Sequence, residues 1–269
     1  MLPPVSTAAD ITYRESGRED APALVLLHGI GSTSAGWRLQ YEPLGRHCRV
    51  IAWDAPGYGG SKPLAGDAPS AAAYALALAR LLDALGVPQA VIATNSWGTP
   101  TGVVFARLYP QRVRGLVLGG PAAGWGALPK EERDKRVATR LERVRALGMK
   151  KMREEDAAEL VAPGTRAEVI QWIQGAEGLH VEGYAQAARM LAEVDVPREA
   201  AGVRCPATVV CGELDRRTPP ETNARRIAAA LRGASLRMVP DCGHLPHLEH
   251  PEIFNAAVLE MLAQAGQPA

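Results

Sequence analysis

The sequence predicts an α/β protein whose mostly parallel sheet is flanked by helices and carries an inserted helical segment. Three observations lead to this fold class: six short apolar runs, the helical patterns that separate most of them, and one long interval without a strand pattern. Continuous apolar runs are typical of strands that helices cover on both faces. With 269 residues, the chain can form one such domain with an insertion.

The six apolar runs are expected to be buried strands. They are Ala23–Leu27, Val50–Trp53, Ala90–Thr94, Gly115–Leu118, Ala207–Cys211 and Leu236–Val239. Between the second and third run, residues Ser70–Leu85 carry leucine and alanine at three- and four-residue spacing, which predicts a helix that stops at Gly86. Alternating strands and helices indicate parallel βαβ units, in which ligands bind at the carboxyl ends of the strands.

The longest interval between strands runs from residue 122 to residue 197. Its sequence is charged and amphipathic, and it contains no convincing strand. A single crossover does not need about 75 residues. We therefore predict a helical cap at 122–197, inserted into a core domain that consists of 1–121 and 198–269.

Within the predicted cap, a helix is expected from Lys130 to Met149. Four arginines follow the spacing of this helix: Arg133, Arg136, Arg140 and Arg143. Such a basic stripe would steer an anionic substrate. Because acidic residues are interleaved with it, we favour a solvated face that local ion pairs stabilise.

Composition limits the class of partner. Thirty lysines and arginines against 29 aspartates and glutamates argue against nucleic acid or a membrane surface, and favour a small-molecule ligand. The four cysteines form no C-x-x-C pair, which predicts free thiols rather than a zinc site or disulfides. Without a leader-like start or a membrane-length apolar run, the expected location is the cytoplasm. The sequence leaves open whether the chain forms a homo-oligomer.

A candidate nucleophile lies in the sequence TNSWG, residues Thr94–Gly98, between an apolar strand and a probable helix. A sharp strand-to-helix turn there would expose the hydroxyl of Ser96 at the end of the sheet and leave the amide of Trp97 free. Strand and helix nearly touch in such an elbow, so small residues are needed. Gly98 meets this need, but Thr94 occupies the position where G-x-S-x-G has its first glycine.

Two further candidate catalytic residues, an aspartate and a histidine, follow later predicted strands. Asp215 lies a few residues past the run that ends at Cys211, and His244 lies after the next run. The order Ser96, Asp215, His244 suits a triad in which histidine takes the serine proton and the carboxylate orients the imidazole. Four nearby residues compete for these roles less well because of their positions: His247, His250, Asp241 and Asp195.

The segment HGIG, residues 28–31, follows the first long apolar run. The amides of Ile30 and of Trp97 are expected to converge on the negative oxygen that develops during acyl transfer. Both donors are main-chain groups, so the apolar side chain of Ile30 is no objection. For His28, a structural hydrogen-bonding role is favoured over a catalytic one.

Five motifs together resemble the α/β-hydrolase superfamily over essentially the whole chain. They are HGIG at 28–31, WDAPGYGGS at 53–61, TNSWG at 94–98, GELDRRTPP at 212–220 and DCGHLPHLEHP at 241–251. The resemblance implies an eight-stranded, mostly parallel sheet, a helical cap over the active site, and neither cofactor nor metal. Within the superfamily, residues 182–196 and 212–223 look like the 3-oxoadipate enol-lactonases and their esterase relatives, which usually have methionine after the serine.

The resemblance also separates related activities. Haloalkane dehalogenases have aspartate at the position of Ser96, so dehalogenation is disfavoured even though Trp97 matches their halide-binding tryptophan. Carbon–carbon bond hydrolases of ring-cleavage products use the same triad and often have asparagine before the serine, as Asn95 is here. These hydrolases remain an alternative, and so does a ligand-binding or signalling member of the fold that turns over slowly.

We therefore predict a serine hydrolase that cleaves a small carboxylic ester or lactone through an acyl-enzyme. Small-molecule pockets are mostly apolar, and five large side chains are candidates to bind the substrate. They are Trp37, Trp125, Trp172, Tyr184 and Met190. Each of them could instead belong to a hydrophobic core.

Overall fold

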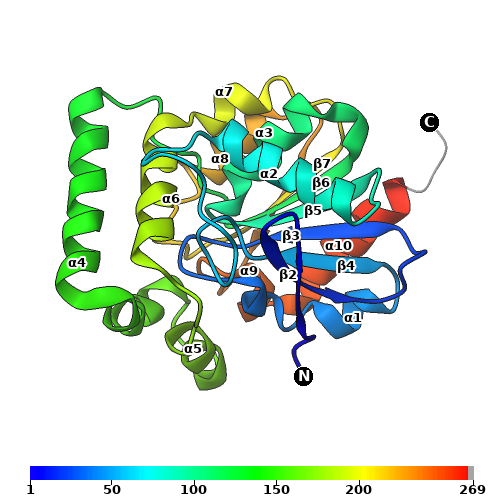
Figure 1. The fold of residues 1–269 in the computed structure, drawn as a ribbon, viewed down its shortest axis with the longest axis horizontal. Coiled ribbons are helices and arrows are strands. Elements are labelled where there is room, and N and C mark those ends of the chain that lie inside the picture. Colours follow the sequence, from blue (N-terminus) through cyan, green and yellow to red (C-terminus); the bar gives the residue numbers. More distant parts are fainter. Residues whose placement is uncertain (266–269) are drawn as a thin grey trace.

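In the computed structural model, which describes residues 1–265, eight strands form one sheet in the order β1-β2-β4-β3-β5-β6-β7-β8 (Figure 1). The strands are β1 (Val5–Ala8), β2 (Ile11–Ser16), β3 (Ala23–Leu27), β4 (Arg49–Trp53), β5 (Ala90–Asn95), β6 (Val113–Gly119), β7 (Ala207–Gly212) and β8 (Ser235–Val239). Strand β2 pairs antiparallel with both β1 and β4, and all other pairs are parallel. The predicted fold class is confirmed.

The six predicted strands correspond to β3 through β8, with ends that differ by at most two residues. The first two strands have no continuous apolar run, because β1 is largely exposed and β2 is buried over only its first half. The residue pattern therefore missed both, and only the family resemblance implied them.

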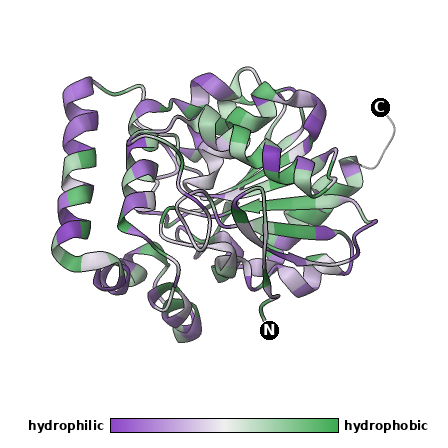
Figure 2. Cartoon of the chain, viewed as in Figure 1, coloured by the Kyte–Doolittle hydropathy of each residue, from purple (hydrophilic) through white to green (hydrophobic). Residues whose placement is uncertain are grey.

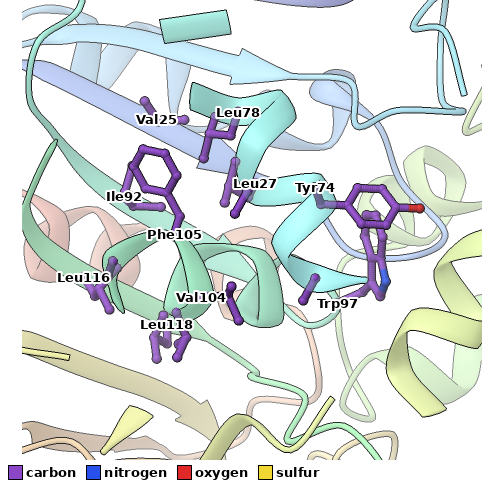
Figure 3. Close-up of a cluster of buried hydrophobic side chains, with 14 of the residues drawn as sticks. Val25, Leu27, Tyr74, Leu78, Ile92, Trp97, Val104, Phe105, Leu116 and Leu118 are labelled. Carbon is purple, nitrogen blue, oxygen red and sulfur yellow. The ribbon is translucent and has the colours of Figure 1, made fainter. Parts of the chain in front are cut away.

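Helices cover both faces of the sheet (Figure 1). On one face lie α2 (Ala71–Ala84), α3 (Gly98–Leu108) and α8 (Ala224–Ala230), and on the other lie α1 (Tyr41–Gly45) and α10 (Pro251–Ala265). Alternate residues of β3 enter the two cores: Val25 and Leu27 face α2 and α3, while Leu24 and Leu26 face the opposite layer. Figure 3 shows the first core, where Phe105 of α3 lies among strand side chains. Burial of each such aliphatic side chain stabilises the fold by about 1.5–3 kcal/mol.

Between β6 and β7 the chain forms helices α4 (Lys130–Leu160), α5 (Ala167–Gln174), α6 (Val181–Glu193) and α7 (Val196–Ala200). Helix α4 is two helical pieces that meet at Gly148, whose φ of 72° interrupts the helix. It packs on α6, and hydrophilic and hydrophobic residues alternate along it (Figure 2). No helix in the described part of the chain is long and apolar enough to cross a membrane. The predicted domain boundaries at 121 and 197 stay predictions.

The four cysteines are free thiols, as predicted. Burial raises the pKa of the Cys48 and Cys211 thiols to about 12 and that of Cys205 to about 11. Burial also raises the pKa of Cys242. Thiols with such pKa values stay protonated near neutral pH, so the cysteines are poor nucleophiles.

Candidate active site

Ser96 lies in the turn between β5 and α3, at the carboxyl end of a central strand. Its φ of +50° falls in the left-handed region, which a non-glycine residue adopts at a cost of about 1–3 kcal/mol. The Ser96 amide donates to the carbonyl of Gly119 (3.0 Å), and the Ser96 carbonyl accepts from the amide of Thr99 (3.0 Å). These bonds hold the strained turn in place.

The elbow depends on small residues at two positions in α3. A Cβ atom at Gly98 would collide with the carbonyl oxygen of Leu27, so only glycine fits there. A Cβ atom at Gly102 would lie 2.7 Å from Cγ2 of Thr94. Gly102 therefore provides the room for the threonine that replaces the first glycine of G-x-S-x-G. The Thr94 hydroxyl is also hydrogen-bonded to that of Thr99 (3.0 Å).

This contact predicts a coupled effect on stability. In the wild-type background, Gly102→Ala is expected to lower the free energy of unfolding by about 1–3 kcal/mol, because the new methyl overpacks the buried Thr94 side chain. In a Thr94→Ala background, the same change should raise it by up to about 1 kcal/mol, the helix-propensity gain of alanine over glycine. Urea denaturation of the wild type, the two single variants and the double variant measures both effects. Equal effects in the two backgrounds would contradict the packing argument.

His244 follows β8 and forms a hydrogen bond from Nδ1 to Oδ2 of Asp215, at 2.9 Å. Both side chains are buried. The other Asp215 oxygen accepts from the amides of Arg217 and Thr218, each at 2.9 Å, and the Thr218 hydroxyl donates to Oδ2 at 2.7 Å. Burial raises the pKa of Asp215, but attraction to His244 and the hydrogen bonds from His244 and Thr218 outweigh it, so the net pKa is lowered. The carboxylate is therefore ionised and surrounded by donors.

The bond to Asp215 occupies Nδ1 of His244, and Nε2 has no hydrogen-bond partner among residues 1–265. Ser96 and His244 line the same cavity. Their side chains are not hydrogen-bonded to each other within the described structure, and such contacts are often long before substrate binds.

Glu249 holds the loop that carries His244, and the sequence reading missed it. Its carboxylate accepts from the amides of Gly243 and Leu245, on either side of the histidine, each at 2.9 Å. The same carboxylate accepts from the amide of Ala162 at the end of α4 (2.7 Å). An acidic residue five positions after His244 was the available signal, but it does not reveal these partners.

The competing residues lie elsewhere. Asp241 is exposed, and its carbonyl is hydrogen-bonded to His250. Asp195 caps the N-terminus of α7 by accepting from the amide of Arg198. His247 is buried against Trp37, with ring centroids 4.5 Å apart. None of these four residues takes part in the Asp215–His244 hydrogen bond.

The loop after β3 lies directly against the elbow. A Cβ atom at Gly29 would be 3.3 Å from Cβ of Ser96. Among the described residues, the amides of Ile30 and Trp97 donate no hydrogen bond. Two free amides beside a serine are the groups that an oxyanion hole requires. The indole of Trp97 is buried in the core beside Tyr74 (Figure 3), so only its amide is a candidate.

His28 has a structural role in this loop. Its Nδ1 donates to the carbonyl of Gly29 (2.9 Å), and its Nε2 accepts from the amide of Ala55 (3.0 Å). Burial lowers the pKa of His28. With both ring nitrogens engaged and the ring neutral, His28 has no nitrogen free for proton transfer.

A cavity of about 820 Å³ lies over Ser96, between the strand ends and the helices of the inserted segment. Trp125, Trp172 and Tyr184 line it, and their contact with substrate stays a prediction. Trp37 and Met190 instead belong to hydrophobic cores, the alternative given above for each candidate. Trp37 is buried against Phe254 on the α10 side of the sheet, and Met190 faces the α3 core, so neither lines the cavity.

The basic stripe on α4 divides into two parts. Arg133 pairs with Glu193 and Arg143 with Asp156, and neither arginine lines the cavity. The other two, Arg136 and Arg140, lie over the ring of Trp125 and line the cavity. Arg136 also pairs with Glu132, so local ion pairing, the favoured interpretation, describes three of the four arginines.

Buried His247 predicts a measurable acid sensitivity. Burial and repulsion from His244 lower the pKa of His247 to about 3, whereas the unfolded value is near 6.5. Between these pH values the unfolded chain binds one more proton, so this residue makes stability fall as pH falls, by roughly 1.4 kcal/mol per unit. His247→Phe should remove that contribution in pH-dependent urea unfolding. An unchanged slope would mean that the ring is not held neutral.

Residues 24–257 match the model of the alpha/beta hydrolase family. The chain is 30% identical, over 93% of its length and 90% of the relative, to 2-hydroxy-6-oxononadienedioate/2-hydroxy-6-oxononatrienedioate hydrolase 2 of Pseudomonas putida. It is similar to a malate-bound thermophilic esterase from Thermogutta terrifontis (30% identity, TM-score 0.82, covering 96% and 95% of the two chains). It is also similar to the enol-lactonase from Burkholderia xenovorans LB400 (25%, 0.81, 97% and 100%).

Proposed function

Because this chain belongs to the alpha/beta hydrolase family, we propose that it is a serine hydrolase that cleaves a small carboxylic ester or lactone through an acyl-enzyme. The observation that carries the proposal is the 2.9 Å bond between Nδ1 of His244 and Asp215. Since Nδ1 donates, Nε2 presents a lone pair, which is the tautomer that a general base needs. The strained turn at Ser96 opens onto the same cavity.

In the proposed first half-reaction, the hydroxyl oxygen of Ser96 attacks the substrate carbonyl carbon while Nε2 of His244 accepts the hydroxyl proton. The carbonyl oxygen becomes negative, and the amides of Ile30 and Trp97 donate to it. Asp215, whose lowered pKa keeps it ionised, stabilises the imidazolium. Nε2 then returns the proton to the leaving oxygen as the C–O bond breaks.

In the second half-reaction, His244 removes a proton from water, and the hydroxide attacks the acyl carbon. Collapse of the second tetrahedral intermediate releases the carboxylic acid and restores the Ser96 hydroxyl. For a lactone, the alcohol and acid products are the two ends of one molecule.

Carbon–carbon bond hydrolysis is the second candidate. The Pseudomonas putida relative supports it, because that protein is named as a hydrolase of 2-hydroxy-6-oxononadienedioate. Asn95, before the serine, donates from its side chain to the carbonyls of Gly119 and His244. These bonds tie the elbow to the histidine loop, so Asn95 is not a discriminating feature by itself.

A substrate panel distinguishes the candidates. The panel contains short p-nitrophenyl esters, a carboxylate-bearing enol-lactone and a 2-hydroxy-6-oxodienoate, and kcat/KM is measured for each. An ester or lactone hydrolase should have its highest kcat/KM with the esters or the enol-lactone. A carbon–carbon hydrolase should have its highest kcat/KM with the dienoate. A fluorophosphonate should label Ser96 covalently with one equivalent, as measured by mass spectrometry of the peptide that contains Ser96. Folded protein with neither turnover nor labelling would refute both proposals and favour a binding role.

A further inference from the structure

Arg153 is a buried cation without a partner. It lies in the second piece of α4, is 7% exposed, and lines the cavity. It makes no ion pair or hydrogen bond with any residue in the described range 1–265, and its Nε atom is fully buried and unsatisfied. Buried charges in proteins are normally paired, because leaving water costs several kcal/mol. An unpaired one that faces a cavity indicates a missing anion.

Asp156, one helical turn after Arg153, does not supply that anion. The carboxylate of Asp156 is bound by Arg143 at 2.5 Å and faces Arg217 at 3.5 Å. Burial lowers the pKa of Arg153 to about 10, against the opposing attraction of Asp156. The guanidinium therefore still carries its charge near neutral pH.

The guanidinium is close to the predicted oxyanion loop. Its Nη1 atom is 2.5 Å from where a Cβ atom would stand at Gly31, the residue after Ile30. An anion on Arg153 would thus lie beside the carbonyl that Ile30 is proposed to polarise. The other charges around the cavity also favour an anion, since seven arginines and three acids line it. The acids are Asp54, Asp156 and Glu177, and the arginines are Arg14, Arg38, Arg136, Arg140, Arg153, Arg217 and Arg226.

We propose that Arg153 binds a carboxylate of the substrate, so that the ester or lactone hydrolysed by this protein is an anion. The proposal rests on the function proposed above and adds the chemical class of its substrate. A carboxylate would accept two parallel N–H bonds from the planar guanidinium, which fixes its orientation as well as its charge. Arg153 is then a specificity-determining residue.

The kinetic test uses two acyl groups that differ in charge. The kcat/KM of mono-p-nitrophenyl glutarate is divided by that of p-nitrophenyl butyrate, so a general loss of activity cancels. In Arg153→Met the ratio should fall by at least about 30-fold, the effect of removing one partner of a buried charge pair. The ratio for Arg153→Lys should lie between those of Arg153→Met and wild type, because lysine keeps the charge but cannot donate two parallel hydrogen bonds from one planar group.

Arg226→Met is the matched control. It removes the same charge from an exposed residue that lines the same cavity, so solvent screening should limit the change in the ratio to less than about threefold. Similar losses in Arg153→Met and Arg226→Met would overturn the proposal in favour of a general electrostatic field.

A binding measurement tests the site without catalysis. Glutarate should raise the Tm of Ser96→Ala and leave that of Ser96→Ala/Arg153→Met unchanged, because only the first retains the carboxylate site. Without glutarate the double variant should have the higher Tm, since it lacks the unpaired buried charge. Equal glutarate shifts in both proteins would refute the carboxylate site. Absence of turnover with every substrate would instead refute the proposed hydrolysis. The glutarate-induced shift in Tm would still test the carboxylate site, because it does not depend on catalysis.

Discussion

Ser96→Ala is expected to reduce kcat/KM for the preferred ester or lactone by about 10⁴-fold or more, because the proposed acyl-enzyme forms on the Ser96 oxygen. The four cysteine thiols have raised pKa values, and both nitrogens of His28 are engaged. Any remaining activity would come from substrate binding and the oxyanion amides. Steady-state kinetics and fluorophosphonate labelling measure the two consequences.

Two variants separate the chemistry from the fold. Ser96→Gly should be as inactive as Ser96→Ala but more stable to heat, because glycine adopts a φ of +50° without strain. Ser32→Ala removes a hydroxyl from another serine that lines the cavity, and should change kcat/KM by less than about threefold. Wild-type-like turnover in Ser96→Ala would eliminate the proposed nucleophile.

Asp215→Asn is expected to lower kcat by about 10⁴-fold through the wrong histidine tautomer. The amides of Arg217 and Thr218 are fixed donors, so the oxygen of the new amide must stay on them. Its NH₂ group then faces His244 and requires Nδ1 to accept. The ring proton moves to Nε2, where it blocks removal of the serine proton.

Asp241→Asn is the matched control for this experiment. The chemical change is the same and the residue is only three positions from His244, but its side chain is exposed and does not contact the ring. Asparagine also tolerates the φ of +52° at this position. A large loss of kcat in Asp241→Asn with little loss in Asp215→Asn would reverse the assignment of the acid.

Local patterns in the sequence were sufficient for much of the fold. Strands β3 to β8 were readable because each is an apolar run between helical segments, although β8 is buried only at Val239 and not throughout as expected. Ser70 was readable as the start of α2, where it accepts from the amide of Ala73. Strands β1 and β2 were not, since exposed and polar residues interrupt any apolar run there. Helix α4 was expected to end at Met149, but the chain resumes a helix after Gly148 and continues to Leu160.

The candidate site was predictable where function coincides with position along a strand. Ser96, Asp215 and His244 each follow a strand, and parallel strands bring such positions to one edge. The candidate substrate-binding residues offered no comparable signal, because a large apolar side chain suits a pocket and a core equally. Trp125 lines the cavity while Trp37 is buried in the core on the α10 side of the sheet, and their sequence contexts do not distinguish the two outcomes.

By itself, the sequence determined the α/β-hydrolase fold, most of its strands and the order of three candidate catalytic residues, since these follow from hydrophobic pattern and short motifs. Only the tertiary structure decided which groups have partners. Gly102 accommodates Thr94, Glu249 joins the histidine loop to α4, and Arg153 makes no ion pair within residues 1–265. Packing and charge pairing depend on distances between residues far apart in the chain, and a linear pattern does not contain those distances.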